Sequence, residues 1–226
     1  MIPSLISEEA VDTIPSYILD AVRLCKVIFA ENERTSRRFL KKLDRSIVID
    51  DFEWYTIHNA EQETTQALQQ AIRANKNIAI ISEAGCPGIA DPGQFLIAEA
   101  QKMNCKIKPL VGPSSILLAL MASGMNGQHF EFVGYLPVDA QERNKKIKEL
   151  ELSSEKDDST KIFIETPYRN QVLLESLLKQ CQSKTRICIG ADITGPMESI
   201  VTKTVAEWKK SPPTLPKIPV IFLIQS

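Results

Sequence analysis

The chain of 226 residues has little histidine, and its cysteines show no pairing pattern. It contains only two histidines, His58 and His129, which argues against a histidine general base and against a His-rich metal site. The five cysteines are odd in number, scattered and without a Cys-x-x-Cys pair. This pattern argues against a disulfide framework or a zinc ribbon and favours a reducing cytoplasm. No metal site is predicted.

Long apolar runs and an excess of one charge are also absent. No apolar stretch approaches the length that spans a bilayer, and no basic stretch followed by an apolar segment opens the chain. Neither a membrane span nor a signal peptide is therefore expected. The formal net charge is −1, so any contact with nucleic acid must come from a local basic patch.

Short apolar strands alternate with helical segments in the first part of the chain. Strands are expected at Lys26–Ala30, Asn77–Ser82 and, more weakly, Lys106–Leu110. Helices are expected between them, at about Thr13–Leu24, Glu33–Leu43, Glu61–Ala74, Pro92–Met103 and Pro113–Ser123. This alternation is typical of an α/β fold whose mostly parallel sheet is covered on both faces.

The pattern changes after about Phe130. A strand at Phe130–Pro137 leads into a charged helix at Gln141–Leu150, and the polar stretch Glu151–Thr160 is expected to be an exposed loop. A helix at Pro167–Cys181 is then expected among the strands Lys161–Glu165, Arg186–Ala191, Ser199–Thr204 and Pro219–Ile224. The late strands have little helix between them, which indicates an antiparallel portion. We predict two α/β domains, residues 1–134 with a mostly parallel sheet and residues 135–226 with a mixed sheet.

Six of the nine glycines fall between positions 85 and 127. The most informative segment there is Ile81–Gly93 (ISEAGCPGIADPG), which follows an apolar strand and precedes a helix. In an open α/β sheet, ligands bind beyond the carboxyl ends of strands, and glycine lets the backbone approach a ligand closely. The segment matches neither a P-loop nor a Gly-x-Gly-x-x-Gly motif. From composition alone, a ligand loop and a tight connection without a ligand are equally supported.

A second segment of this kind is Pro109–Ser115 (PLVGPSS), in which proline opens a helix with two serines in its first turn. The unpaired N–H groups of a helix N-terminus can bind a carboxylate or a hydroxyl. Ser114 and Ser115 are therefore candidate ligand contacts, and helix capping is the alternative.

These two segments carry a family resemblance. ISEAGCPGIADPG resembles the Ser-Asp-Ala-Gly-Thr-Pro…Asp-Pro-Gly signature of the ribosomal RNA small subunit methyltransferase I family, a branch of the tetrapyrrole methylases. PLVGPSS is similar to that family's Pro-Leu-Pro-Gly-Pro segment. Four further stretches align in order over nearly the whole chain: AENERTS at Ala30–Ser36, FVGYLP at Phe132–Pro137, IETPYR at Ile164–Arg169 and the end strand IPVIFLI.

The resemblance implies a two-domain homodimer that holds S-adenosylmethionine in the cleft between its domains and 2′-O-methylates a ribose of small-subunit ribosomal RNA. It implies these cofactor contacts: Glu83, Ala84, Gly85, Cys86, Pro87, Gly88, Ile89, Ser114, Ser115, Tyr168, Ala191 and Pro219. Glu83 stands where the family has aspartate, and Cys86 where it has threonine. A methylase of a small tetrapyrrole-like substrate and a catalytically degenerate cofactor-binding module are the alternatives.

The start of the chain departs from the family pattern. The family opens with a strand that ends in a Pro-x-Gly-type loop under the cofactor. This sequence begins MIPSLISEEA, with almost no strand before Pro3 and no glycine before Gly85. We expect either that the sequence starts late or that the first strand is nearly lost.

Methylation of a ribose hydroxyl needs a hydrogen-bond acceptor or base near that hydroxyl. Glu31 directly follows the first predicted strand, and Arg34 comes shortly after it. They match the family's Glu-Asp-Thr-Arg segment, with Asn and Glu between them, and are the predicted catalytic pair. Glu165 and Arg169 hold the equivalent place in the second domain. For all four, a surface ion pair or a carboxylate at a helix start is the alternative.

A basic stripe is indicated by spacing alone. Cations recur at i, i+3, i+4, i+7, i+8 and i+11, at Arg34, Arg37, Arg38, Lys41, Lys42 and Arg45. On a helix they share one face and are predicted to contact RNA phosphates, with a solvated face paired to acids as the alternative. A second basic group comprises Arg143, Lys145, Lys146 and Lys148. The aromatic candidates for base stacking are Trp54, Tyr55, Tyr135 and Tyr168.

Overall fold

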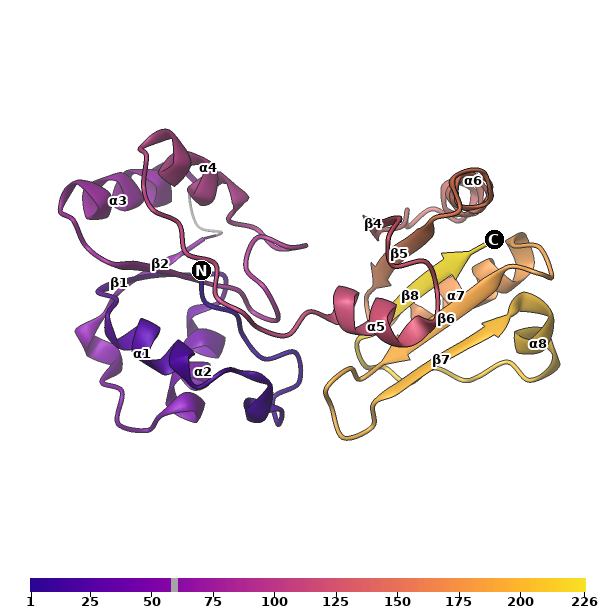
Figure 1. The fold of residues 1–226 in the computed structure, drawn as a ribbon, viewed down its shortest axis with the longest axis horizontal. Coiled ribbons are helices and arrows are strands. Elements are labelled where there is room, and N and C mark those ends of the chain that lie inside the picture. The colour runs from indigo at the N-terminus through magenta and orange to yellow at the C-terminus, as the bar shows by residue number, and fades with distance from the viewer. Residues whose placement is uncertain (58–60) are drawn as a thin grey trace. The chain divides into compact units, whose positions relative to one another are not determined.

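A computed structural model describes residues 1–57 and 61–226, which form two compact units, Met1–Ser114 and Ser115–Ser226 (Figure 1). The first unit contains strands β1 (Val27–Ala30), β2 (Glu53–Thr56) and β3 (Ile78–Ile81). Its helices are η1 (Val11–Thr13), α1 (Tyr17–Arg23), α2 (Glu33–Leu43), η2 (Ile49–Asp51), α3 (Glu61–Arg73) and α4 (Gln94–Lys102). Among the described residues, no helix combines the length and the apolar character needed to cross a membrane.

The first sheet is parallel throughout, in the order β2-β1-β3. All four residues of β1 are fully buried because helices cover both faces of this central strand. Ile28 and Ala30 pack with α1 and α2, whereas Val27 and Phe29 pack with α3 and α4. Figure 1 shows these two helix pairs on opposite sides of the sheet. The predicted parallel sheet is confirmed, and β2, a short edge strand of polar character, is an addition to it.

The N-terminal segment takes the place of a further strand beside β3. Ile2 forms an isolated parallel bridge to Ile81, and its N–H donates to the carbonyl of Ile80 at 2.9 Å. The Ser4 N–H donates to the Gly85 carbonyl at 2.8 Å. The described N-terminal residues thus form two isolated bridges, Ile2 to Ile81 and Ser4 to Gly85.

The strand predicted at Lys106–Leu110 does not form, and residues 106–110 have no regular secondary structure. The N-terminal segment lies beside residues 106–110 and forms two hydrogen bonds with them. The Met1 ammonium donates to the Lys108 carbonyl at 2.9 Å, and the Leu110 N–H donates to the Met1 carbonyl at 3.1 Å. Pro3 follows and has no N–H to extend a ladder.

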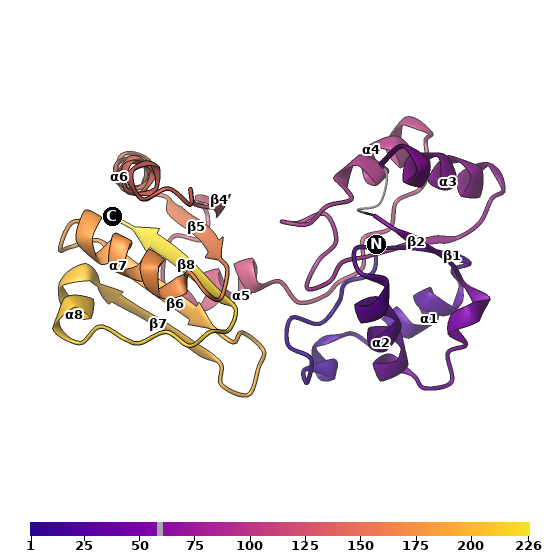
Figure 2. The ribbon, with the colours of Figure 1, turned by 180° about the vertical axis from the view of Figure 1, so that it is seen from behind.

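The second unit consists of a mixed sheet with helices on both faces. Its elements are α5 (Ser115–Ser123), β4 (Phe130–Tyr135), α6 (Ala140–Asp157), β5 (Thr160–Glu165), α7 (Asn170–Gln180), β6 (Arg186–Ala191), β7 (Ser199–Thr204), α8 (Val205–Lys210) and β8 (Val220–Gln225). The strand order is β4-β5-β8-β6-β7, with only β4 and β5 parallel. Helices α6, α7 and α8 pack on one face and α5 on the other (Figures 1 and 2). The predicted mixed sheet is confirmed.

The division between the units lies at Ser114/Ser115, twenty residues before the predicted boundary at 134/135. Helix α5 buries Ile116, Ala119 and Leu120 against the second sheet, and β4 pairs with β5. Both elements therefore belong to the second unit, although they follow the glycine-rich block in sequence. Composition does not reveal this, because it does not specify which sheet an apolar helix covers.

The polar stretch predicted as a loop at 151–160 continues helix α6 as far as Asp157. Glu151 and Ser154 are buried on the inner side of this helix. The Glu151 carboxylate accepts hydrogen bonds from the Gln182 N–H (2.7 Å) and the Thr185 hydroxyl, and the Ser154 hydroxyl donates to the Ser159 carbonyl at 2.6 Å. Internal hydrogen bonds, rather than apolar side chains, hold this part of the helix against the unit.

A substitution at Gly112 tests whether the packing of the N-terminal segment stabilises the first unit. A Cβ at this position would overlap the side chain of Pro3, so we expect Gly112→Ala to destabilise the first unit by about 1–3 kcal/mol. Urea unfolding followed by Trp54 fluorescence in a Trp208→Phe background measures this unit alone, because the chain has two tryptophans. Gln62→Ala, at an exposed position of α3 in the same unit, is the control. Equal unfolding midpoints for both variants would contradict the close approach of Pro3.

Candidate functional site

Two predicted site residues meet at one edge of the first sheet. Glu31 directly follows β1, and Glu83 follows β3 by two residues. Since β1 and β3 are parallel neighbours, their carboxyl ends lie side by side. The Glu83 N–H donates to Oε2 of Glu31 at 2.9 Å. The Glu31 carboxylate therefore fixes the start of the loop that follows β3.

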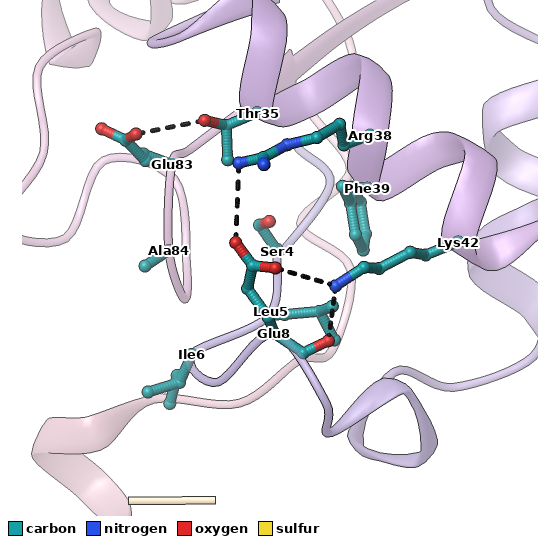
Figure 3. Close-up of a pocket in the computed structure, with 10 residues that line it drawn as sticks. All are labelled: Ser4, Leu5, Ile6, Glu8, Thr35, Arg38, Phe39, Lys42, Glu83 and Ala84. Atoms are coloured by element: carbon teal, nitrogen blue, oxygen red, sulfur yellow. Dashed lines mark hydrogen bonds and ion pairs between the residues drawn. The ribbon is translucent and has the colours of Figure 1, made fainter. Parts of the chain in front are cut away.

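The Glu83 carboxylate is held by two neutral donors from the start of α2. Its Oε1 accepts hydrogen bonds from Nδ2 of Asn32 and from the Thr35 hydroxyl, each at 3.2 Å (Figure 3 shows the latter). Asn32 is also the N-cap of α2, and its Oδ1 accepts from the Thr35 N–H at 3.2 Å. An asparagine amide both donates and accepts, so one side chain caps the helix and orients Glu83.

The loop after Glu83 folds back on itself and contacts the second predicted segment. The Ser82 hydroxyl donates to the Gly85 carbonyl at 2.8 Å, and Gly85 has φ +70°, which favours glycine. The Cys86 thiol lies 3.5 Å from the carbonyl oxygen of Pro113, within hydrogen-bond range for sulfur. Cys86 of this loop thereby contacts Pro113, the residue before Ser114. Ile89 is half exposed.

Asp91 belongs to the same edge, although it was not among the predicted site residues. Burial, and then the charges of Glu31 and Glu83, raise the pKa of Asp91 to about 7. Its Oδ2 is buried, and no hydrogen-bond partner for it is found among the described residues. The only sequence signal for Asp91 is its place in the Asp-Pro-Gly part of the loop motif.

A cavity of about 250 Å³ lies beside this edge, between the N-terminal segment and α2. Ser4, Leu5 and Ile6 form one wall, and Glu83 and Ala84 contribute to it from the β3 loop. Thr35, Arg38, Phe39 and Lys42 of α2 complete it, together with Glu8 (Figure 3). Two members of the predicted basic stripe thus lie next to a predicted cofactor residue.

Of the rest of the predicted basic stripe, Arg34, Arg37 and Lys41 lie on α2 and Arg45 does not. Helix α2 ends at Leu43, so Arg45 lies beyond it and accepts a hydrogen bond through its carbonyl from Lys41 (3.0 Å). Arg37 pairs with Glu33 and lies over the Trp54 ring at 5.2 Å. Arg34, the predicted partner of Glu31, is exposed at the start of the helix.

The second unit brings its own predicted residues together at one sheet edge. Strands β5 and β6 both run antiparallel to β8, so their carboxyl ends meet the start of β8, where Val220 pairs with Glu165 on one side and Ala191 on the other. The Asp192 N–H donates to the Pro219 carbonyl at 3.2 Å. Tyr168 is 80% exposed, and the Lys217 ammonium lies 5.7 Å from its ring centroid. Ser115 begins α5.

Glu165 and Arg169 form an ion pair at this edge, but it is largely buried rather than on the surface. The Arg169 guanidinium lies 2.7 Å from Glu165, whose side chain is only 1% exposed. The Thr166 N–H donates to the same carboxylate at 2.7 Å. The pair holds the loop that carries Tyr168 and is not the surface ion pair that was the alternative.

In the second basic group, Lys145 and Lys148 are exposed, Lys146 is partly exposed and Arg143 is not exposed. Arg143 is buried, and its guanidinium donates to the carbonyl of Val138 (2.8 Å) and to the Ser176 hydroxyl (3.2 Å). Of the stacking candidates, Tyr55 stacks on Phe29 and Trp54 donates to the Ile49 carbonyl, so both serve packing.

Comparison with known proteins identifies the family. The sequence model of the tetrapyrrole (corrin/porphyrin) methylases matches residues 11–209. The chain belongs to this family. Two curated relatives named ribosomal RNA small subunit methyltransferase I are similar to this methylase chain. The Vibrio cholerae protein is 29% identical over 84% of this chain and 63% of its own length, and the Mesorhizobium japonicum protein is 31% identical over 83% and 61%. The chain thus spans about 60% of the length of these relatives.

Solved structures confirm the tetrapyrrole-methylase fold. The methyltransferase CobJ superposes with a TM-score of 0.60 at 16% identity, covering 95% of this chain and 89% of that one. Uroporphyrin-III C-methyltransferase from Thermus thermophilus, complexed with S-adenosyl homocysteine, superposes with a TM-score of 0.53 at 12% identity, covering 95% and 92%. At these identities the likeness establishes the fold of this chain, and not its substrate.

The raised pKa of Asp91 gives the stability of this chain a measurable pH dependence. Between its ordinary pKa of 3.8 and about 7, the folded protein keeps a proton on Asp91 that the unfolded chain has released. This group therefore lowers the free energy of unfolding as pH rises through that range. We expect Asp91→Asn to gain stability relative to wild type as pH rises from about 4 to about 7, measured by urea unfolding. Asp12→Asn, an exposed aspartate, should show no such gain; a constant difference for Asp91→Asn would refute its burial beside Glu31 and Glu83.

Proposed function

We propose that this chain is an S-adenosylmethionine-dependent methyltransferase that 2′-O-methylates a ribose in small-subunit ribosomal RNA. The observation that carries the proposal is the sequence match of this chain to the tetrapyrrole methylase family and to ribosomal RNA methyltransferases. In the structure, the two loops that resemble that family contact each other at the carboxyl edge of the parallel sheet. In α/β folds, that edge is where ligands bind. Because the chain spans about 60% of these relatives, its own activity needs a direct test.

Hydrogen-bond acceptors in the first unit match the hydrogen-bonding groups of S-adenosylmethionine. S-adenosylmethionine carries ribose hydroxyls and an ammonium group, which are hydrogen-bond donors, and a sulfonium that supplies the methyl group. The edge offers acceptors, namely the carboxylate of Glu83 and the buried Oδ2 of Asp91. We assign Glu83, Ala84, Gly85, Cys86, Pro87, Gly88, Ile89 and Ser114 to cofactor binding in this unit.

The second unit would supply the remaining cofactor contacts. Tyr168 presents an exposed ring suited to lie against the adenine, and the backbone around Ala191 and Pro219 lies at the same edge. Ser115 at the start of α5 completes the assignment. Backbone N–H and C=O groups at a sheet edge can bind the hydrogen-bonding edge of a base without a dedicated side chain.

Glu31 is the proposed group that assists deprotonation. As the ribose oxygen forms its bond to the methyl carbon and the carbon–sulfur bond breaks, the hydroxyl proton must pass to an acceptor. Glu31 lies at the strand edge beside Glu83, and Arg34 follows at the start of α2. One oxygen of Glu31 already accepts the Glu83 N–H, so the same carboxylate would position the loop and receive the proton.

RNA contact is assigned to the basic stripe, that is, to the five cations of α2 and to Arg45 beyond its end. Arg34, Arg38, Lys41, Lys42 and Arg45 are exposed and Arg37 is partly exposed. Each phosphate contact adds to the salt dependence of binding. A homodimer, a cytoplasmic location and the lack of a metal remain predictions from the sequence and the resemblance.

A small tetrapyrrole-like substrate is the second candidate, because the same fold occurs in uroporphyrin-III methyltransferases. Titration calorimetry with S-adenosylmethionine tests the first step, and absence of binding would favour a degenerate module. Transfer of a labelled methyl group to small ribosomal subunits, compared with a porphyrin panel, separates the two substrates. We expect transfer to the ribosomal subunit that weakens as salt increases.

Glu31→Gln separates the two roles of Glu31. Glutamine keeps an oxygen that can accept the Glu83 N–H, but it cannot take up a proton at neutral pH. We expect kcat for RNA methylation to fall about 10²- to 10⁴-fold, while the affinity for S-adenosylhomocysteine, measured by calorimetry, stays within about twofold. Glu63→Gln on α3, which is exposed, is the control. Unchanged kcat in Glu31→Gln would leave Glu31 with a positioning role only.

A further inference from the structure

The carboxylate of Glu8 bridges the two cations of the cavity beside the sheet edge. It lies 3.5 Å from the guanidinium of Arg38 and 3.2 Å from the ammonium of Lys42. The Lys42 ammonium also donates to the Glu8 carbonyl at 2.9 Å. Figure 3 shows the carboxylate between the two cationic side chains. Glu8 comes from the N-terminal segment, and the cations come from α2.

This carboxylate is held by charge but is not enclosed. The hydrogen bond from Lys42, followed by the charges of Lys42 and Arg38, lowers the pKa of Glu8. The side chain of Glu8 is nevertheless 72% exposed and that of Arg38 57%. Exposed ion pairs contribute little to stability and exchange readily with other anions. An external anion can therefore replace Glu8 without unfolding its surroundings.

The cavity carries the charges that a phosphate group needs. Two cations, Arg38 and Lys42, face the single carboxylate of Glu8. The other acidic residue that lines the cavity, Glu83, accepts hydrogen bonds from Asn32 and Thr35. An arginine can bind a phosphate through two parallel hydrogen bonds, and a lysine adds a point charge. The remaining wall is the N-terminal segment and the apolar Phe39.

We propose that this cavity is a phosphate-binding site, and that Glu8 occupies the place of the phosphate until a phosphodiester of the RNA backbone displaces it. The identity of the occupant as RNA rests on the proposed function, whereas the anion site does not. A phosphate bound by Arg38 and Lys42 would lie in the cavity that Glu83 and Ala84 also line. Glu8 then acts as an internal competitor, because an external anion must displace it before binding to Arg38 and Lys42.

Glu8→Gln should strengthen anion binding, because it removes the competitor and keeps the size of the side chain. We expect affinity for a fluorescent single-stranded oligoribonucleotide to rise about two- to fivefold, the range that exposed ion pairs support. The plot of log affinity against log salt should become steeper by about one, because a salt anion now occupies the cations and is released. Glu9→Gln makes the same charge change at the neighbouring exposed residue and should show a smaller gain in affinity.

Removal of a cation should cancel the gain. In Glu8→Gln/Arg38→Met and Glu8→Gln/Lys42→Met, affinity should fall to or below that of wild type. Equal RNA affinities for Glu8→Gln and Glu9→Gln would overturn the displacement of Glu8 by RNA.

Inorganic phosphate separates this proposal from the proposed function. Backbone amide NMR should show tighter phosphate binding in Glu8→Gln than in Glu9→Gln, with shifts near Arg38 and Lys42, even if no variant binds RNA or S-adenosylmethionine. That result with no RNA binding would keep the anion site and reject RNA as its occupant. Equal phosphate binding in the two variants would reject the anion site itself.

Discussion

The hydrogen bond from the Glu83 N–H to the Glu31 carboxylate is the contact on which the rest of the site depends. It joins the carboxyl ends of two parallel strands, so it forms only where β1 and β3 are in register. It fixes where the loop after β3 begins and thus where Glu83 meets Asn32 and Thr35. A parallel sheet gives such an edge because all of its strands end on the same side.

Charges of opposite sign lie close together in the first unit. At the strand edge, burial and the charges of Glu31 and Glu83 raise the pKa of Asp91 to about 7. Neutral donors bind Glu83, so its charge stays available to a cationic ligand. In the adjoining cavity, Arg38 and Lys42 present the opposite sign. A sulfonium donor and a polyanionic acceptor need these two environments at a short distance, and both RNA phosphates and the carboxylates of a porphyrin meet that need.

The spacing of apolar and polar residues predicted those helices and strands whose formation depends on residues nearby in sequence. Helix α2 begins at Glu33 and ends at Leu43 as predicted, and the apolar strands β1 and β3 were identified. The structure differs where long-range contacts decide. Glu151 and Ser154 extend α6 through buried hydrogen bonds, and α5 joins the second sheet through packing. Within the site, no local signal connects Glu8 with Lys42, which is 34 positions away.

The N-terminal segment links the stability of the sheet edge to the charge of the cavity. Ile2 and Ser4 bind the backbone next to β3, and Pro3 packs against Gly112 so closely that the latter has no room for a Cβ. Only four residues further along, Glu8 reaches Arg38 and Lys42. Four residues span at most about 14 Å, because each residue spans at most about 3.6 Å. The N-terminal segment thus contacts both the proposed cofactor loop, through Ser4 and Gly85, and the proposed phosphate site, through Glu8.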